Sequence, residues 1–176
     1  MDPVHGGIPL LTHEVEIIDH PLFQRLRYIC QNDILALVFP GATHSRFLHS
    51  IGVMHGGGRM FRAMVENSLK HKPNIKKQIS DDTLNAISFF NQLVRSACLL
   101  HDVGHSSFSH QFNRTPTIKQ TLSSNGRFAS LWQNIHYTDF YPTPPLHLEH
   151  EHFSVRAAWQ ILNDIGQEQL SLPMND

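Results

Sequence analysis

The chain's most informative stretch is Leu99-Leu100-His101-Asp102-Val103-Gly104-His105-Ser106-Ser107-Phe108-Ser109-His110. An apolar helical run ends there in a His-Asp dipeptide, and a glycine follows two residues later. Adjacent His and Asp side chains can face one cation at a helix end, and imidazole with carboxylate is the ligand mixture of Mg, Mn, Fe or Zn rather than of a soft thiolate site. Gly104 lacks a Cβ where the backbone must approach a ligand or turn sharply. The stretch therefore predicts a divalent metal ion site at the end of a helix.

Length and composition favour a single globular domain over residues 1–176, with 40% apolar and 16% charged residues. The formal net charge of −1 gives no electrostatic case for nucleic acid or an anionic membrane as the main partner. No apolar run approaches the ~20 residues that span a bilayer, and the N-terminus lacks a secretion signal, so a cytoplasmic location is expected. Cys30 and Cys98 are expected to be buried thiols of a reducing compartment. Histidine stands out, because its 14 residues equal the sum of Lys and Arg.

The elements outside this stretch are predicted to be helical, so the fold class is all-α. Residues 1–13 contain two prolines and two glycines and are expected to form a short irregular or β-like segment. A helix is expected to begin at Pro21 and to end at Asn32-Asp33, and Thr43 or Ser45 can cap a helix over about 45–66. The Gly56-Gly57-Gly58 run in that helix lowers helix propensity and predicts close packing of another helix.

Two further helices complete the predicted bundle. One is capped at Ser80-Asp81-Asp82 and runs to His101, and the other covers 149–162. Apolar stripes at helical spacing are expected to face the core in all three long helices. Those stripes are Phe47, Ile51, Met54, Met60, Phe61, Met64 and Val65; Leu84, Ile87, Phe90, Leu93, Val94, Cys98 and Leu99; and Phe153, Val155, Ala158, Trp159 and Leu162.

Clusters of histidine and arginine accompany the His-Asp pair. Arg46 and His49 are three residues apart and share one helical face. A cation held by His49 and the His-Asp pair would lower the pKa of bound water and make a nucleophile near neutral pH. Arg46 is placed to clamp phosphate oxygens, and His110 or His150 to give a proton to a leaving oxygen. These clusters predict metal-dependent phosphate chemistry.

At this point the chain resembles the HD-domain phosphohydrolases, in the branch of the dNTP triphosphohydrolases. The matching stretches follow one another in the family's order over most of residues 2–160 and predict an HD-domain helical bundle. They are Asp2-Pro3-Val4-His5-Gly6, Phe23-Gln24-Arg25-Leu26-Arg27-Tyr28-Ile29, Val38-Phe39-Pro40-Gly41-Ala42, Arg46-Phe47-Leu48-His49-Ser50-Ile51-Gly52-Val53, His101 to His110, and His150-Glu151.

The resemblance implies a role for each matching residue. His49, His101 and Asp102 match three of the family's four metal ligands, Arg46 matches an arginine on the substrate phosphates, and Gln31 matches a glutamine on the deoxyribose. Histidines around the α-phosphate are matched by His105, His110 and His150, with His110 expected to be the general acid. A guanine-nucleotide activator site in some relatives is matched by Asp19, Gln24 and Arg27. The family reaction is attack of metal-activated water at the α-phosphorus of a dNTP, which releases a deoxynucleoside and triphosphate.

The chain departs from the family pattern at both ends, and at the first end the Asp2-Pro3-Val4-His5-Gly6 motif begins at residue 2, whereas the family has further residues before it. The family's fourth ligand is an aspartate beyond the stretch matched here, and the surroundings of Asp164 do not resemble its motif. The chain is therefore expected to be a fragment of a longer enzyme or a shortened relative with impaired catalysis. Hydrolysis of another nucleotide phosphate ester, and a non-catalytic module that binds nucleotide or a partner, stay open as alternatives.

Plainer alternatives also stay open for single residues. Arg46 can instead pair with Asp33 or Glu66 on the surface, and His105 with His110 can orient the ligands rather than take part in catalysis. For Asp19, Gln24 and Arg27 a structural ion-pair network is favoured over an activator site. The relatives assemble as oligomers, and the aromatic residues around 128–141 are candidates for a homo-oligomer interface.

Overall fold

Helices form the fold, as the sequence predicts. The computed structural model describes residues 5–72, 74, 79–107, 115–118, 120 and 150–171. The elements in chain order are α1 (Thr12–Asp19), α2 (Pro21–Gln24), the 3₁₀ helices η1 (Arg25–Tyr28) and η2 (Leu35–Leu37), α3 (Arg46–Lys70), α5 (Asp81–Leu100) and α10 (His150–Ser171). Within these residues there is no strand, and Cys30 and Ser45 form an isolated β-bridge.

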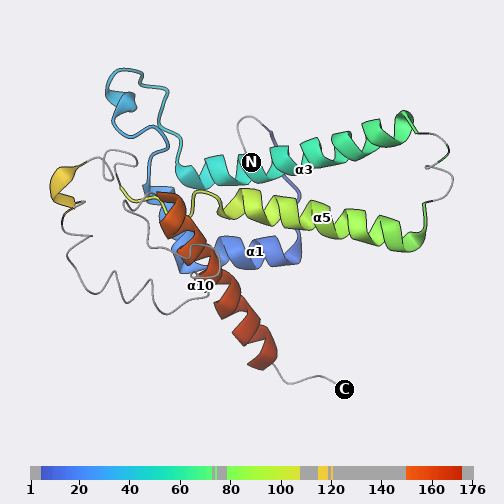
Figure 1. The fold of residues 1–176 in the computed structure, drawn as a ribbon. Helices are drawn as coiled ribbons and strands as arrows, with labels where there is room; N and C mark the ends of the chain where they lie inside the picture. Colours follow the sequence, from blue (N-terminus) through green and yellow to red (C-terminus); the bar gives the residue numbers. More distant parts are fainter. Residues whose placement is uncertain are drawn as a thin grey trace.

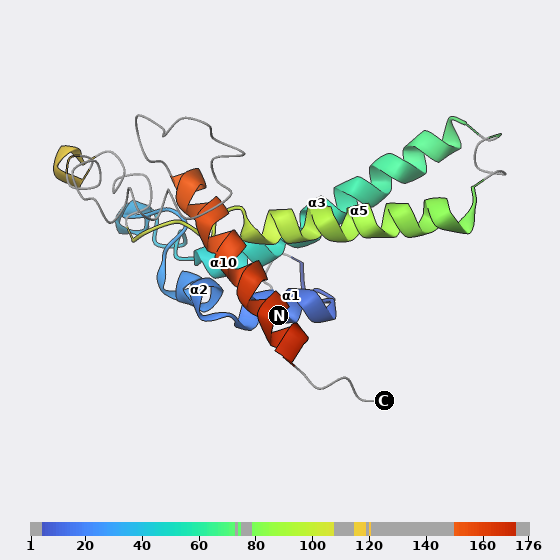
Figure 2. The same cartoon turned by 60° about the horizontal axis from the view of Figure 1, so that its bottom comes forward.

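Helices α3 and α5 lie side by side and antiparallel, and α10 crosses them near the C-terminal end of α5 (Figures 1 and 2). The start of α3 and the end of α5 therefore meet at the same end of the pair. Helix α3 also contacts η1, and α1 contacts α10. This end of the bundle brings together residues that are about 50 and 100 positions apart in the sequence.

The predicted caps are confirmed. The Ser45 hydroxyl accepts a hydrogen bond from the Leu48 amide at 3.4 Å, and the Ser80 hydroxyl accepts one from Thr83 at 3.3 Å. Each cap satisfies one of the amides that a helix start leaves without a partner. Pro21 occupies the start of α2, as expected, but this helix ends at Gln24 and continues only as η1.

Helix α1 was not predicted, and its first two residues, Thr12 and His13, lie in the segment that was expected to be irregular or β-like. It begins at Thr12 and buries Ile17 and Ile18 together with a charged residue, Glu14. The Glu14 carboxylate accepts hydrogen bonds from Arg95 of α5, with Nε to Oε1 at 2.6 Å and Nη2 to Oε2 at 2.7 Å. Both side chains are buried, so this ion pair fixes α1 against α5.

The glycine run of α3 packs closely against α5, which confirms the predicted helix contact. A Cβ on Gly57 would lie 2.5 Å from Sγ of Cys98, and one on Gly58 would lie 2.8 Å from Cγ of Arg95. A Cβ on Gly56 would meet nothing within 4 Å. Two of the three glycines therefore allow the helix axes to approach.

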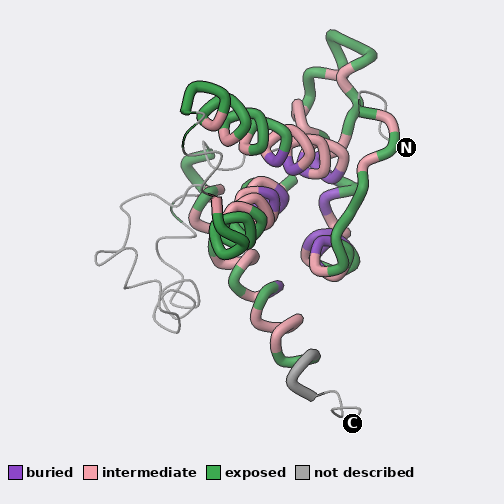
Figure 3. The backbone as a smooth tube through the Cα atoms, turned by 90° about the vertical axis from the view of Figure 1, so that its right-hand side faces the viewer, coloured by how far each residue is buried: buried purple, intermediate pink, exposed green. Residues whose placement is uncertain are grey.

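The core is smaller than the apolar stripes predict. It consists of Ile17, Ile18, Phe23, Leu26, Ile29, Phe47, Met54, Leu99, Leu100, Val103 and Ile161. Several stripe residues expected in it are exposed: Met60, Met64, Leu84, Phe90, Leu93, Val155, Trp159 and Leu162. Cys30 is also exposed, contrary to the prediction. Figure 3 shows that the C-terminal end of α3 and the N-terminal end of α5 are exposed, and Figure 1 shows these ends extending beyond α1 and α10.

In the described part of the chain, no helix has the length and apolar character needed to cross a membrane. His110, expected as the general acid, and the aromatic segment around 128–141 lie outside the described residues.

Candidate metal and phosphate site

Three candidate metal ligands meet where α3 begins and α5 ends. His49 comes from the first turn of α3, and His101 and Asp102 directly follow α5. Their ligand atoms all lie within 4.8 Å of one another. Nε2 of His49 is 3.8 Å from Oδ2 of Asp102, and Nε2 of His101 is 3.4 Å from Oδ1. Two imidazole nitrogens and a carboxylate therefore surround one point, and this donor set fits a divalent metal ion.

The orientation and protonation of these side chains also suit metal binding. Nδ1 of His101 lies 2.7 Å from the Cys98 carbonyl, a contact that leaves Nε2 on the side of Asp102. Burial lowers the pKa of His49, so its ring is neutral and carries a free lone pair at neutral pH. Burial alone would raise the pKa of Asp102, but the nearby His101 and Arg46 hold it below the usual value, so Asp102 is a carboxylate.

Arg46 is part of this site and is only 2% exposed. Its Nη1 donates to Oδ2 of Asp102 at 2.6 Å, and its Nη2 lies 3.4 Å from the Gln31 carbonyl. Arg46 is therefore not a surface residue that pairs only with Asp33 or Glu66, although the charge of Asp33 also acts on it. A guanidinium beside a candidate metal site is placed to contact an anionic ligand of that metal.

His105 lies near Oδ1 of Asp102, and His150 stacks on His105. Nε2 of His105 is 3.5 Å from Oδ1, and the His105 and His150 rings stack with 3.9 Å between centroids. Together with Asp102 they form a second group whose ligand atoms lie within 4.8 Å of one another. Gln31 contributes its backbone carbonyl to Arg46, while its side-chain Oε1 is buried. The structure thus gathers five of the predicted residues around Asp102 and Arg46.

The residues matched to an activator site make contacts with other partners. Nε2 of Gln24 donates to the Ile18 carbonyl at 2.6 Å, and Nε of Arg27 donates to Oε1 of Gln24 at 2.6 Å. The Arg27 guanidinium also stacks on the Phe47 ring, 3.6 Å from its centroid. Asp19 is exposed at the end of α1. Gln24 and Arg27 thus contact each other, and the choice between a structural ion-pair network and an activator site stays a prediction.

Asp164 does not join the metal ligands. Its Oδ2 lies 3.3 Å from Nε2 of His20, whose Nδ1 accepts a hydrogen bond from the Leu22 amide.

Sequence reasoning missed two residues that contact the turn after Asp102. Arg25 donates hydrogen bonds to the carbonyls of Val103 and His105, and Ser154 accepts one from the Gly104 amide. Gly104 was a signal of close backbone approach, but the partner of that approach is 50 residues away.

The chain is similar to a known domain family and to several known proteins. The family model of the HD domain matches residues 46–136, just over half of the chain. The deoxynucleoside triphosphate triphosphohydrolase SAMHD1 of Bos taurus is 34% identical over 169 residues, which are 96% of this chain and 23% of that protein. SAMHD1 of Homo sapiens is 45% identical over 113 residues, 64% of this chain and 16% of that protein, and SAMHD1 of Xenopus laevis is 43% identical over 112 residues, again 64% and 16%. The chain thus spans less than a quarter of the length of these relatives.

Proposed function

The chain belongs to the HD-domain family, and on that premise we propose that it is a metal-dependent phosphohydrolase that cleaves a dNTP to a deoxynucleoside and triphosphate. His49, His101 and Asp102 are the metal ligands, Arg46 binds the substrate phosphates, and Gln31 contacts the sugar. His105 and His150 surround the α-phosphate with His110, the proposed general acid. The observation that carries the proposal is the group of three ligand atoms within 4.8 Å of one another, with a buried arginine on the same carboxylate.

In the proposed reaction the water oxygen bonds to the α-phosphorus and the bond from that phosphorus to the sugar oxygen breaks. A divalent cation, when bound, would supply Lewis-acid polarisation of the phosphate and the water. The planar Arg46 guanidinium carries several donors that match phosphate oxygens, and its burial strengthens their attraction for an anion. His110, as the general acid, then protonates the departing sugar oxygen, since an imidazole suits proton transfer near neutral pH.

The test is identification of the product. The full chain is incubated with Mn²⁺ and each of the four dNTPs, and phosphate products are separated by ion chromatography. We expect inorganic triphosphate, which is lost in Asp102→Ala and retained in the matched control Asp82→Ala, an exposed carboxylate at the far end of α5. Orthophosphate as the product would contradict attack at the α-phosphorus, and pyrophosphate would contradict breakage of the bond between that phosphorus and the sugar oxygen. Metal and dNTP binding without any product would contradict turnover and favour a non-catalytic module.

A further inference from the structure

One peptide group in the turn after Asp102 is held from both sides. The carbonyl of Val103 and the amide of Gly104 belong to the same peptide plane. The carbonyl accepts a hydrogen bond from Nη2 of Arg25, and the amide donates to Oγ of Ser154 at 3.0 Å. Because a peptide group is planar, fixing both of its ends fixes its rotation.

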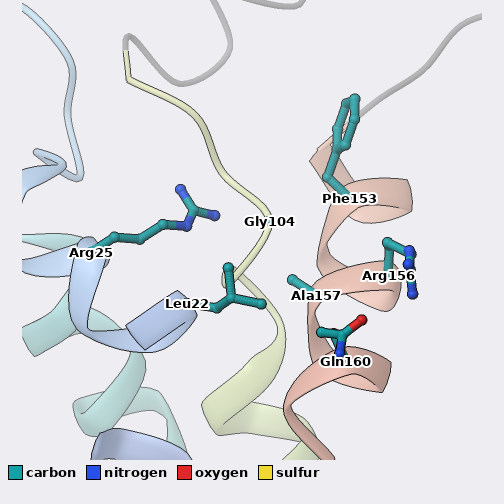
Figure 4. Close-up of a pocket in the computed structure, with 7 residues that line it drawn as sticks. All are labelled: Leu22, Arg25, Gly104, Phe153, Arg156, Ala157 and Gln160. Carbon is teal, nitrogen blue, oxygen red and sulfur yellow. The ribbon is translucent and has the colours of Figure 1, made fainter. Parts of the chain in front are cut away.

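The Arg25 guanidinium holds a second carbonyl of the same turn. Its Nη1 donates to the His105 carbonyl at 2.6 Å, so one planar fork spans two carbonyls that are two residues apart. Figure 4 shows this guanidinium directed toward the Gly104 segment, with Ala157 of α10 beyond that segment. Arg25 and Ala157 both line a pocket of about 310 Å³. Arg25 lies on η1 and Ser154 on α10, so two separate elements bind the turn.

On the side of α10, the turn at Gly104 is in close steric contact with the helix backbone. A Cβ on Gly104 would collide with backbone atoms of Phe153 and Ser154. The turn therefore cannot shift toward α10, and Arg25 limits its movement in the opposite direction. Asp102 precedes the held peptide and His105 follows it, and their side chains lie 3.5 Å apart in the candidate site.

We propose that Arg25 and Ser154 are positioning residues that set the relative orientation of Asp102 and His105 through the Val103–Gly104 peptide. Neither side chain is a ligand or a catalytic group. The proposal rests on the proposed function, since the orientation serves a metal and phosphate site. Residues that orient metal ligands typically change metal affinity by 10–100-fold when they are replaced.

The experiment uses the full chain with Arg25→Lys, Ser154→Ala and the double variant. Lysine keeps the charge but not the two-pronged fork, and alanine removes the acceptor of the Gly104 amide. The matched controls are Arg62→Lys and Ser68→Ala, both at exposed positions of α3. Three quantities are measured: Mn²⁺ affinity by calorimetry, the His105 ring signals by NMR in metal-free protein, and the melting temperature.

We expect each single variant to shift the His105 ring signals and to weaken Mn²⁺ binding at least about tenfold. The double variant should lose about as much Mn²⁺ affinity as the single variant that binds Mn²⁺ more weakly, because both substitutions free the same peptide group. The controls should match the wild type.

Other results would overturn the proposal. Folded variants with unchanged His105 signals and Mn²⁺ affinity within twofold of wild type would leave Arg25 and Ser154 a purely structural role. If the two fold-losses in Mn²⁺ affinity multiply in the double variant, Arg25 and Ser154 do not act through one peptide group, and the proposal is refuted. If the wild type binds no Mn²⁺, the proposed metal site fails, while the His105 signals still decide the positioning role. If Arg25→Lys does not fold, Ser154→Ala decides it alone.

Discussion

Replacing the three consecutive glycines of α3 one at a time with alanine should change the stability of the protein in opposite directions. A new Cβ at Gly56 meets nothing within 4 Å, whereas one at Gly57 would lie 2.5 Å from Sγ of Cys98. At Gly58 the new Cβ would lie 2.8 Å from Cγ and 3.1 Å from Cδ of Arg95. The three substitutions are chemically identical and adjacent, so their differences report the helix contact alone.

The expected magnitudes follow from helix propensity and from these contacts. Alanine in place of glycine stabilises a helix interior by about 1 kcal/mol, which is the whole effect expected at Gly56. Overpacking adds a loss of about 1–3 kcal/mol at the other two positions. Cys98 is small and can rotate, so Gly57→Ala should lie near neutral or slightly below wild type. Arg95 is held by the buried Glu14, so it cannot move away, and Gly58→Ala should lose roughly 2 kcal/mol net.

Thermal melts followed by circular dichroism measure these differences. For a chain of this size, 1 kcal/mol shifts the melting temperature by about 2–4 °C. Gly56→Ala should therefore melt about 2–4 °C above the wild type, and Gly58→Ala about 4–8 °C below it. If Gly58→Ala is as stable as Gly56→Ala, the close packing of α3 on α5 is refuted.

Three further predictions concern the buried charges and the turn. Glu14→Gln should lower the free energy of unfolding by about 3–5 kcal/mol in urea titrations because it leaves Arg95 charged and unpaired, and the exposed Glu66→Gln should not. Burial alone would raise the pKa of Glu14, but its hydrogen bonds to Arg95 hold it below the usual value. The stability that the Glu14 carboxylate contributes is therefore complete above about pH 4.3 and is lost as the pH falls through its folded-state pKa. The urea midpoint of the wild type should fall in acid, and that of Glu14→Gln should fall less. Gly104→Ala should lower the melting temperature by more than the Ser154→Ala change does, because its Cβ meets backbone rather than a side chain that can move.

The long helices could be predicted because their signals are local. Serine caps at Ser45 and Ser80 and apolar residues at helical spacing define α3 and α5 without knowledge of any neighbour. Helix α1 gives no such signal, because its buried face includes the charged Glu14, and a carboxylate normally indicates a solvent-facing position. The partner that makes this burial favourable, Arg95, is 81 residues away.

Exposure could not be predicted from the same stripes. Helical spacing shows which residues share a face, but it does not show whether another element covers that face. Met60 is 75% exposed and Leu93 is 52% exposed, although both continue stripes that are buried near the site. The C-terminal end of α3 and the N-terminal end of α5 extend past α1 and α10 (Figure 1).

The candidate site was partly predictable for a similar reason. The His-Asp dipeptide, and Arg46 three residues before His49, indicate chemistry from residue types and spacing alone. The short contact between Arg46 and Asp102 joins residues 56 positions apart, and only the antiparallel packing of α3 on α5 brings them together. No local pattern distinguishes Arg46 from an exposed arginine.

The central claim is attack of water at the α-phosphorus, and the position of an oxygen label tests it most directly. The full chain is incubated with Mn²⁺ and a dNTP in ¹⁸O-labelled water, and both products are analysed by mass spectrometry. Attack at the α-phosphorus places one ¹⁸O in the triphosphate and none in the deoxynucleoside. Label in the deoxynucleoside, or the absence of labelled triphosphate, would contradict the claim.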